Sequence, residues 1–219
     1  MKPPVINADE FLKSMAAEAV KQREQIRTAI RDLTLEALQI RELSLKQINN
    51  VVRNISAGVN LGVGDAKVDT GIALSDALAG MDDALLKVVE ANKIALHKLT
   101  DGGASFEDSN LKKGLKELES FEEKFLDSVK QASAKATENV QEQWKVILDK
   151  IPRGGTETGA EVTDVLRTQA RDAQAVARST REAGLKMVHT LSQNYATLVS
   201  GVLIGLSEAL GHDRSKKTR

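Results

Sequence analysis

The 219-residue sequence contains no cysteine, which excludes disulfides, thiolate nucleophiles and zinc sites built on thiolates. Aromatic residues make up only 3% of the chain, with a single tryptophan, so a platform on which nucleic-acid bases stack is not expected. Lys and Arg together number 31, as do Asp and Glu, so the chain lacks the cationic excess that binds phosphate backbones. Nucleic acid is therefore not an expected partner.

Proline is also scarce, because it occurs only at positions 3, 4 and 152, and little in the chain forbids long helices. The sequence lacks the alternating β-branched and aromatic runs that predict strands. Apolar residues instead recur at helical spacing along most of the chain. We therefore predict an all-α fold.

The predicted architecture is a single helical domain, residues 1–219, built as an elongated bundle of about five helices with the last two long. At 1.5 Å per residue, the last two helices would span about 70 Å and about 84 Å, which is too long for a compact globule. The predicted helices cover about 8–41, 45–60, 65–100, 105–151 and 156–211, and a tail follows at 212–219.

Two of the predicted helix starts carry capping signals. Asn7 or Asp9 is expected to cap the first helix, and Ser44-Leu-Lys-Gln47 is expected to open the second helix as a capping box. The glycine-rich segment at 58–64 is expected to end that second helix.

The last predicted helix contains the most apolar part of the chain. Between Lys186 and Glu208, 21 residues carry no formal charge, but only residues 196–206 are strongly apolar, which is too short a run to span a membrane. Apolar residues repeat in this helix at an eleven-residue spacing, which suits a nearly straight helix with one continuous face. The residues expected to contact a surface or a partner are Leu198, Val199, Val202, Leu203 and Leu206.

Two pairs of glycines lie four residues apart, each pair on one face of a predicted helix. These are Gly58 with Gly62, and Gly201 with Gly205. A glycine inside a helix costs about 1 kcal/mol relative to alanine, and a close approach of two helices offsets that cost. We therefore predict that both pairs are helix-packing sites, within the chain or between subunits.

Groups of residues suited to catalysis are missing. His97, His189 and His212 lie in separate segments with no partner four residues away, so they do not predict a metal site. Gly62-Val-Gly64-Asp-Ala-Lys67 lacks the full spacing of a phosphate-binding loop. The sequence predicts no enzyme, with no catalytic, metal or cofactor-binding residue and no cofactor.

Four segments of the sequence are informative: RDLTLEAL at 31–38, VVRNISAGVNLG at 51–62, LKELESFEEKFLDSV at 115–129 and VSGVLIGLSEAL at 199–210. They resemble a family of uncharacterised bacterial all-helical proteins, a domain of unknown function, and this resemblance covers nearly the whole chain in the same order. The resemblance implies a helical fold and no assigned activity. In general character, being all-α, alanine-rich and cysteine-free, the chain is also similar to phasins, the amphipathic proteins that coat polyhydroxyalkanoate granules.

These observations favour a non-catalytic, phasin-like structural protein that self-associates and covers an apolar surface, either a polyester storage granule or a lipid interface. Its expected location is the cytoplasm, at a granule or membrane surface. Two alternatives stay open. One is a membrane-active oligomer that inserts its C-terminal helix, and the other is a cytoplasmic helical scaffold whose apolar faces bind only protein.

Overall fold

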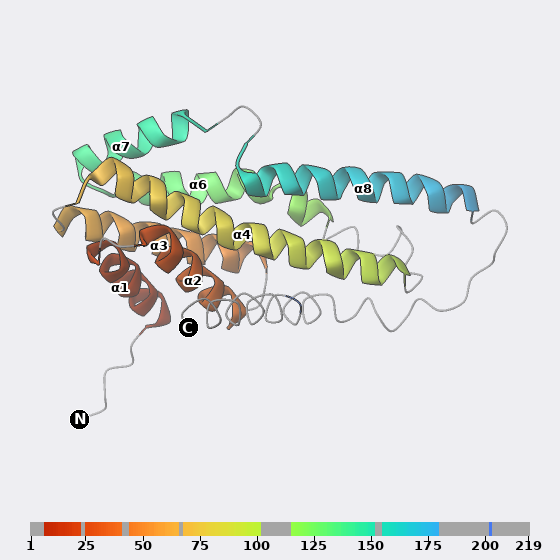
Figure 1. Cartoon of the computed structure of the whole chain (residues 1–219), viewed down its shortest axis with the longest axis horizontal. Coiled ribbons are helices and arrows are strands. Elements are labelled where there is room, and N and C mark those ends of the chain that lie inside the picture. The colour runs from red at the N-terminus through yellow and green to blue at the C-terminus, as the bar shows by residue number, and fades with distance from the viewer. Residues whose placement is uncertain are drawn as a thin grey trace, which may run out of the picture. The chain divides into compact units, whose positions relative to one another are not determined.

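The structure is a computed structural model that describes residues 7–22, 25–40, 44–65, 68–101, 115–151, 155–179 and Val202. Every long regular element in these ranges is an α-helix, and none of these residues lies in a strand (Figure 1). Residues 115–119 are also helical. The helices are α1 (Ala8–Lys21), α2 (Ile26–Gln39), α3 (Leu45–Asp65), α4 (Thr70–Asp101), α6 (Phe121–Ser133), α7 (Glu138–Asp149) and α8 (Glu157–Ser179).

The backbone contacts divide the chain into two compact units. The first unit comprises residues 1–85 and 123–156, and the second comprises residues 86–122 and 157–219. The boundary falls within α4, so the first half of this helix belongs to the first unit and its second half belongs to the second.

The core of the first unit is formed around α3, which contacts both α1 and α2. The start of α3 has the Ser44 part of the expected capping box, because the Ser44 hydroxyl accepts a hydrogen bond from the backbone N–H of Gln47 at 3.4 Å. Asn7 caps α1 by accepting from the N–H of Asp9 at 3.1 Å. The buried apolar side chains of α3 are Ile48, Val51, Val52, Ile55, Val59 and Val63.

The predicted single helix over 8–41 is wrong, because α1 ends at Lys21 and α2 begins at Ile26. Gln25 precedes α2 with φ 61°, a left-handed conformation that costs a non-glycine residue roughly 1–2 kcal/mol. α1 and α2 contact each other and both contact α3, which one straight helix cannot do. Burial of two apolar faces on the same partner therefore outweighs the local tendency to continue the helix.

The expected end of the next helix near residue 60 is also wrong, because α3 continues through the glycine-rich segment to Asp65. Val59 and Val63 are buried in this segment, and their burial offsets the low helix propensity of the glycines. The following helix, expected from residue 65, begins at Thr70, where the Asp69 carboxylate accepts from the N–H of Ile72 at 3.0 Å.

The predicted long helix over 105–151 is broken at 134–137, between α6 and α7. Thr137 is extended, and the side chain of Gln141 donates to the carbonyls of Ala134 at 3.4 Å and Ala136 at 2.8 Å. These bonds satisfy carbonyl groups that a continuous helix would pair within its backbone. The described residues alone contain seven labelled helices, so the predicted bundle of about five helices is wrong.

The helix expected over 156–211 begins one residue later, at Glu157, and α8 is described as far as Ser179. Of the remaining predicted span, only Val202 is described, and it is helical. None of the described helices is long and apolar enough to cross a membrane. The buried apolar side chains of the second unit include Val88, Val89, Ala91, Ala95, Leu96, Leu118, Phe121, Val162 and Val165.

Candidate functional site

The closest helix contact in the first unit is the crossing of α1 and α3, where two glycines of α3 lie against the backbone of α1. A Cβ atom at Gly58 would meet the Lys13 carbonyl oxygen and lie 2.8 Å from the Cβ of Ala16. A Cβ atom at Gly62 would lie 2.6 Å from the Ala17 carbonyl oxygen. The face that carries both predicted packing glycines is therefore occupied by α1 of the same chain.

A third glycine, which the sequence did not single out, brings α4 close to α2. A Cβ atom at Gly80 would meet the carbonyl oxygen of Arg27 and lie 3.1 Å from the backbone nitrogen of Arg31. Beside this crossing, the Arg27 guanidinium donates two hydrogen bonds of 2.7 Å to the Asp83 carboxylate. The sequence feature that could have predicted this contact is a glycine in the middle of a strongly helical apolar run, where glycine lowers helix propensity.

The single tryptophan of the chain is fully buried in the first unit and has a polar partner on another helix. The indole Nε1 of Trp144 in α7 donates to Oδ1 of Asn60 in α3 at 2.7 Å. The Asn60 amide nitrogen in turn donates to the carbonyl of Ala132, near the end of α6, at 3.1 Å. One asparagine side chain thus links three helices, and both its donor and its acceptor are used.

Two of the large apolar side chains that are exposed in the described helices lie together on α1. Phe11 is 54% exposed and Met15 is 44% exposed. They are four residues apart and so lie on the same side of the helix, next to the exposed Ala8. We call Ala8, Phe11 and Met15 the α1 outer face. The inner face of the same helix is buried and consists of Leu12, Ala16 and Val20.

The inner and outer faces of α1 together form one apolar surface that covers about half of the helix circumference, at about 100° per residue. Only part of this surface is buried in the described structure. Single exposed apolar residues are common on protein surfaces, but Phe11 and Met15 lie next to each other beside a buried face, which makes the α1 outer face a candidate contact surface. Phe11 and Met15 were not among the predicted contact residues, although their spacing beside Leu12 was a usable signal.

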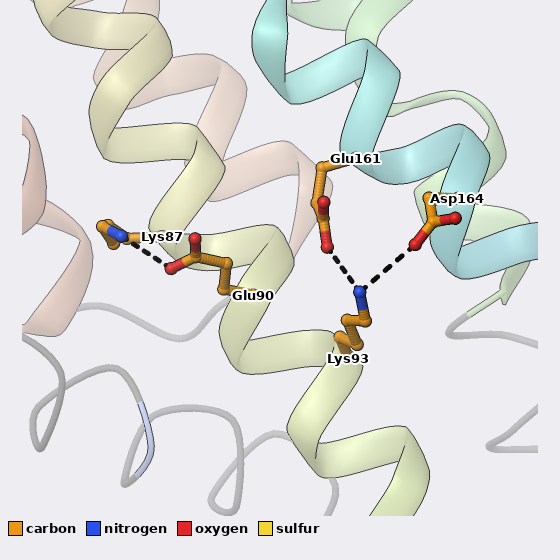
Figure 2. Close-up of polar contacts among 5 residues, drawn as sticks. All are labelled: Lys87, Glu90, Lys93, Glu161 and Asp164. Atoms are coloured by element: carbon orange, nitrogen blue, oxygen red, sulfur yellow. Dashed lines mark hydrogen bonds and ion pairs between the residues drawn. The ribbon is translucent and has the colours of Figure 1, made fainter. Parts of the chain in front are cut away.

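The second unit contains a cross-helix ion-pair cluster, in which Lys93 of α4 lies between two carboxylates of α8 (Figure 2). The Lys93 Nζ atom is 2.8 Å from a Glu161 oxygen and 3.3 Å from an Asp164 oxygen. The hydrogen bond to Glu161 is the main reason that the pKa of Lys93 lies above its ordinary value of 10.5, and Asp164 adds to the effect while burial opposes it. The cluster holds a charged lysine and stabilises the contact between the two helices.

The start of α8 carries a second acidic contact in the same unit. A Cβ atom at Gly159 would collide with the carboxylate of Glu122, so this carboxylate lies directly against the first turn of α8. A negative charge is favourable at that end of a helix because of the unpaired N–H groups and the helix dipole. Glycine at this position leaves the space that the carboxylate occupies.

Most residues of the predicted surface-contact face lie outside the described residues, namely Leu198, Val199, Leu203 and Leu206, together with the glycine pair Gly201 and Gly205. The exception is Val202, which is helical and partly buried. Within the described ranges, no group of three or more His, Asp or Glu side chains is arranged to hold a metal ion.

Residues 1–212 match the family of unknown function DUF6781, and the chain belongs to this family. The expected membership of a family without assigned activity is therefore confirmed, whereas the phasin-like character gains no support from this match. A search of curated proteins found no match. A search of solved structures also found none.

Proposed function

We propose that this member of the DUF6781 family is a non-catalytic structural protein that self-associates and covers an apolar surface with amphipathic helices, as phasins do. The observation that supports the proposal best is the α1 outer face, where Phe11 and Met15 are exposed side by side. The proposed location is the cytoplasm, at the surface of a polyester granule or a lipid interface.

The exposed apolar area of Phe11 and Met15 limits the free energy that the α1 outer face contributes to binding an apolar surface. Complete burial of a side chain such as Phe or Met contributes about 1.5–3 kcal/mol, so covering the exposed half of each contributes roughly 1 kcal/mol. A contribution of that size does not hold a protein on a surface by itself. Adhesion therefore requires a second apolar element or several linked copies, because linked weak contacts reinforce each other.

The second apolar element in this proposal is the C-terminal segment, whose residues Leu198, Val199, Val202, Leu203 and Leu206 have the spacing of one helical face. In the same proposal, Gly201 and Gly205 are packing positions between copies. Gly201→Leu/Gly205→Leu is expected to reduce the oligomer in sedimentation experiments. Gly64→Leu is the control, because no atom lies within 4 Å of a Cβ atom at Gly64.

Flotation of the full-length protein with polyester granules and, separately, with phospholipid vesicles tests surface binding. Phe11→Ser/Met15→Ser removes the α1 outer face without touching the core, and Val202→Asp/Leu206→Asp disrupts the C-terminal face. The control variant is Ile40→Ser/Ile72→Ser, which removes two apolar side chains that are 77% and 63% exposed and lie outside α1. We expect both test variants, but not the control, to lose binding.

Three other outcomes would each contradict part of this proposal. If the intact protein ignores both surfaces while it remains a stable oligomer, the surface-coating proposal is wrong and a protein-binding scaffold explains the apolar faces. If the protein floats with vesicles and resists carbonate extraction, insertion of the C-terminal helix replaces coating. If the control variant loses binding as fully as the α1 variant, the α1 outer face is not the contact.

A further inference from the structure

We propose that Lys93 is an electrostatic latch that holds the start of α8 on α4, and that α8 opens as one segment when this positive charge is removed or screened. The three residues of this latch, Lys93, Glu161 and Asp164, all belong to the second unit. The latch goes beyond the proposed function, because it does not depend on which surface or partner the protein covers.

The latch depends first on geometry. Glu161 and Asp164 are three residues apart in α8, so their side chains lie on the same side of that helix. The Lys93 ammonium lies between them, within hydrogen-bond distance of both (Figure 2). One cation on α4 is thus shared between two carboxylates on α8, and its removal leaves two negative charges near each other without a cation between them.

The latch matters because the start of α8, residues 157–168, buries few apolar side chains. Among the described side chains of α8, the buried apolar ones are Val162 and Val165. A helical segment with so few buried apolar side chains opens more readily than one with a full apolar stripe, so polar contacts make up a larger share of the attachment of residues 157–168. For comparison, α3 buries six apolar side chains: Ile48, Val51, Val52, Ile55, Val59 and Val63.

A neighbouring ion pair on α4 provides an internal comparison. Lys87 is 2.7 Å from Glu90, three residues along the same helix, and this pair involves α4 alone (Figure 2). The side chain of Lys87 is 27% exposed and that of Lys93 is 32% exposed, so the two lysines are exposed to solvent to a similar extent. They differ in that Lys93 joins two helices, whereas Lys87 joins two turns of one helix.

The test is amide hydrogen exchange of the full-length protein, read by mass spectrometry for peptides covering residues 157–168. Lys93→Met is expected to speed exchange there by about three- to tenfold, which corresponds to the loss of two partly exposed ion pairs. Lys87→Met should change the same peptides less than twofold. Since both of these substitutions lie outside α8, the intrinsic exchange rates of its amides are the same in these two variants and in the native protein.

Charge reversal and salt provide two further readouts. Lys93→Glu should open α8, and Lys93→Glu/Glu161→Lys should restore part of its protection, because opposite charges again face each other. Raising the salt to 1 M, where the screening length is about 3 Å, should speed exchange of α8 in the native protein and not in Lys93→Met.

The following results would overturn the latch. Equal exchange of α8 in the Lys93→Met and Lys87→Met variants would show that Lys93 has no special role. Failure of the charge-swapped variant to regain protection would show that the pairing itself is unimportant. If Lys93→Met does not fold, as judged by circular dichroism, Glu161→Gln/Asp164→Asn removes the same pairs from the other side, and unchanged exchange in that variant excludes the latch.

Discussion

The contact between α1 and α3 allows a sharp test, because α3 contains glycines in two opposite environments. Gly58 lies against the backbone of α1, whereas a Cβ atom at Gly64 would have no atom within 4 Å. Both residues are helical, so Gly58→Ala and Gly64→Ala make the same chemical change in the same element. Helix propensity alone predicts that each substitution stabilises the protein by up to about 1 kcal/mol.

Packing predicts a different outcome at Gly58. The atom that a new methyl group would meet is the backbone carbonyl of Lys13, which cannot move aside as a flexible side chain can. Overpacking of this kind costs about 1–3 kcal/mol, so after a propensity gain of about 1 kcal/mol we expect a net loss of up to about 2 kcal/mol. At Gly62 the nearest carbonyl oxygen is 2.6 Å away, which is short of the 3.4 Å at which ordinary contact begins, and we expect a loss there as well.

The assay is thermal unfolding followed by circular dichroism, with the three alanine variants measured beside the native protein. For a chain of this size, a difference of about 2 kcal/mol between Gly58→Ala and Gly64→Ala corresponds to a difference in Tm of about 4–8 °C. Gly58→Ala should melt below the native protein and Gly64→Ala at or above it. If both variants shift Tm in the same direction by the same amount, the close approach of α1 and α3 is refuted.

Three further predictions follow from polar contacts. Asn60→Leu should shift the emission of buried Trp144 to shorter wavelength, because an apolar side chain replaces the polar partner of the indole; unchanged fluorescence would contradict this. It should also lower the free energy of unfolding by about 1–3 kcal/mol, because the indole N–H loses its acceptor. The Arg27–Asp83 pair contributes up to about 1 kcal/mol to the free energy of unfolding. Arg27→Lys should lose most of this contribution, because lysine cannot form two parallel hydrogen bonds to one carboxylate, and a double-mutant cycle measures the loss. Because the pKa of Lys93 is higher in the folded protein than its ordinary value of 10.5, the ion pairs of Lys93 contribute fully to stability below pH 10.5. This contribution is lost as the pH rises through the pKa of Lys93 in the folded protein. The opening of α8, measured against pH, should therefore differ between the native protein and Lys93→Met below pH 10.5 and become equal above the folded pKa.

Several parts of the structure could be predicted from local sequence, because the interactions that cause them span only a few residues. Apolar residues at helical spacing predicted the all-α class. Four residues of α3 that have this spacing are buried in the structure: Ile48, Val52, Ile55 and Val59. The caps at Asn7 and Ser44 depend on hydrogen bonds to residues two and three positions further along. The cost of glycine inside a helix likewise pointed to Gly58 and Gly62 as unusual positions.

Other features required the tertiary structure, because they depend on residues far apart in the chain. No proline or glycine marks the break between α1 and α2 or the break between α6 and α7. Both breaks allow apolar faces to be buried on helices elsewhere in the sequence. The Trp144–Asn60 bond joins residues 84 positions apart, and the bond from Lys93 to Glu161 joins residues 68 positions apart. Periodicity reports which side of a helix is apolar, but the partner of that side is chosen by the free energy of packing the whole chain.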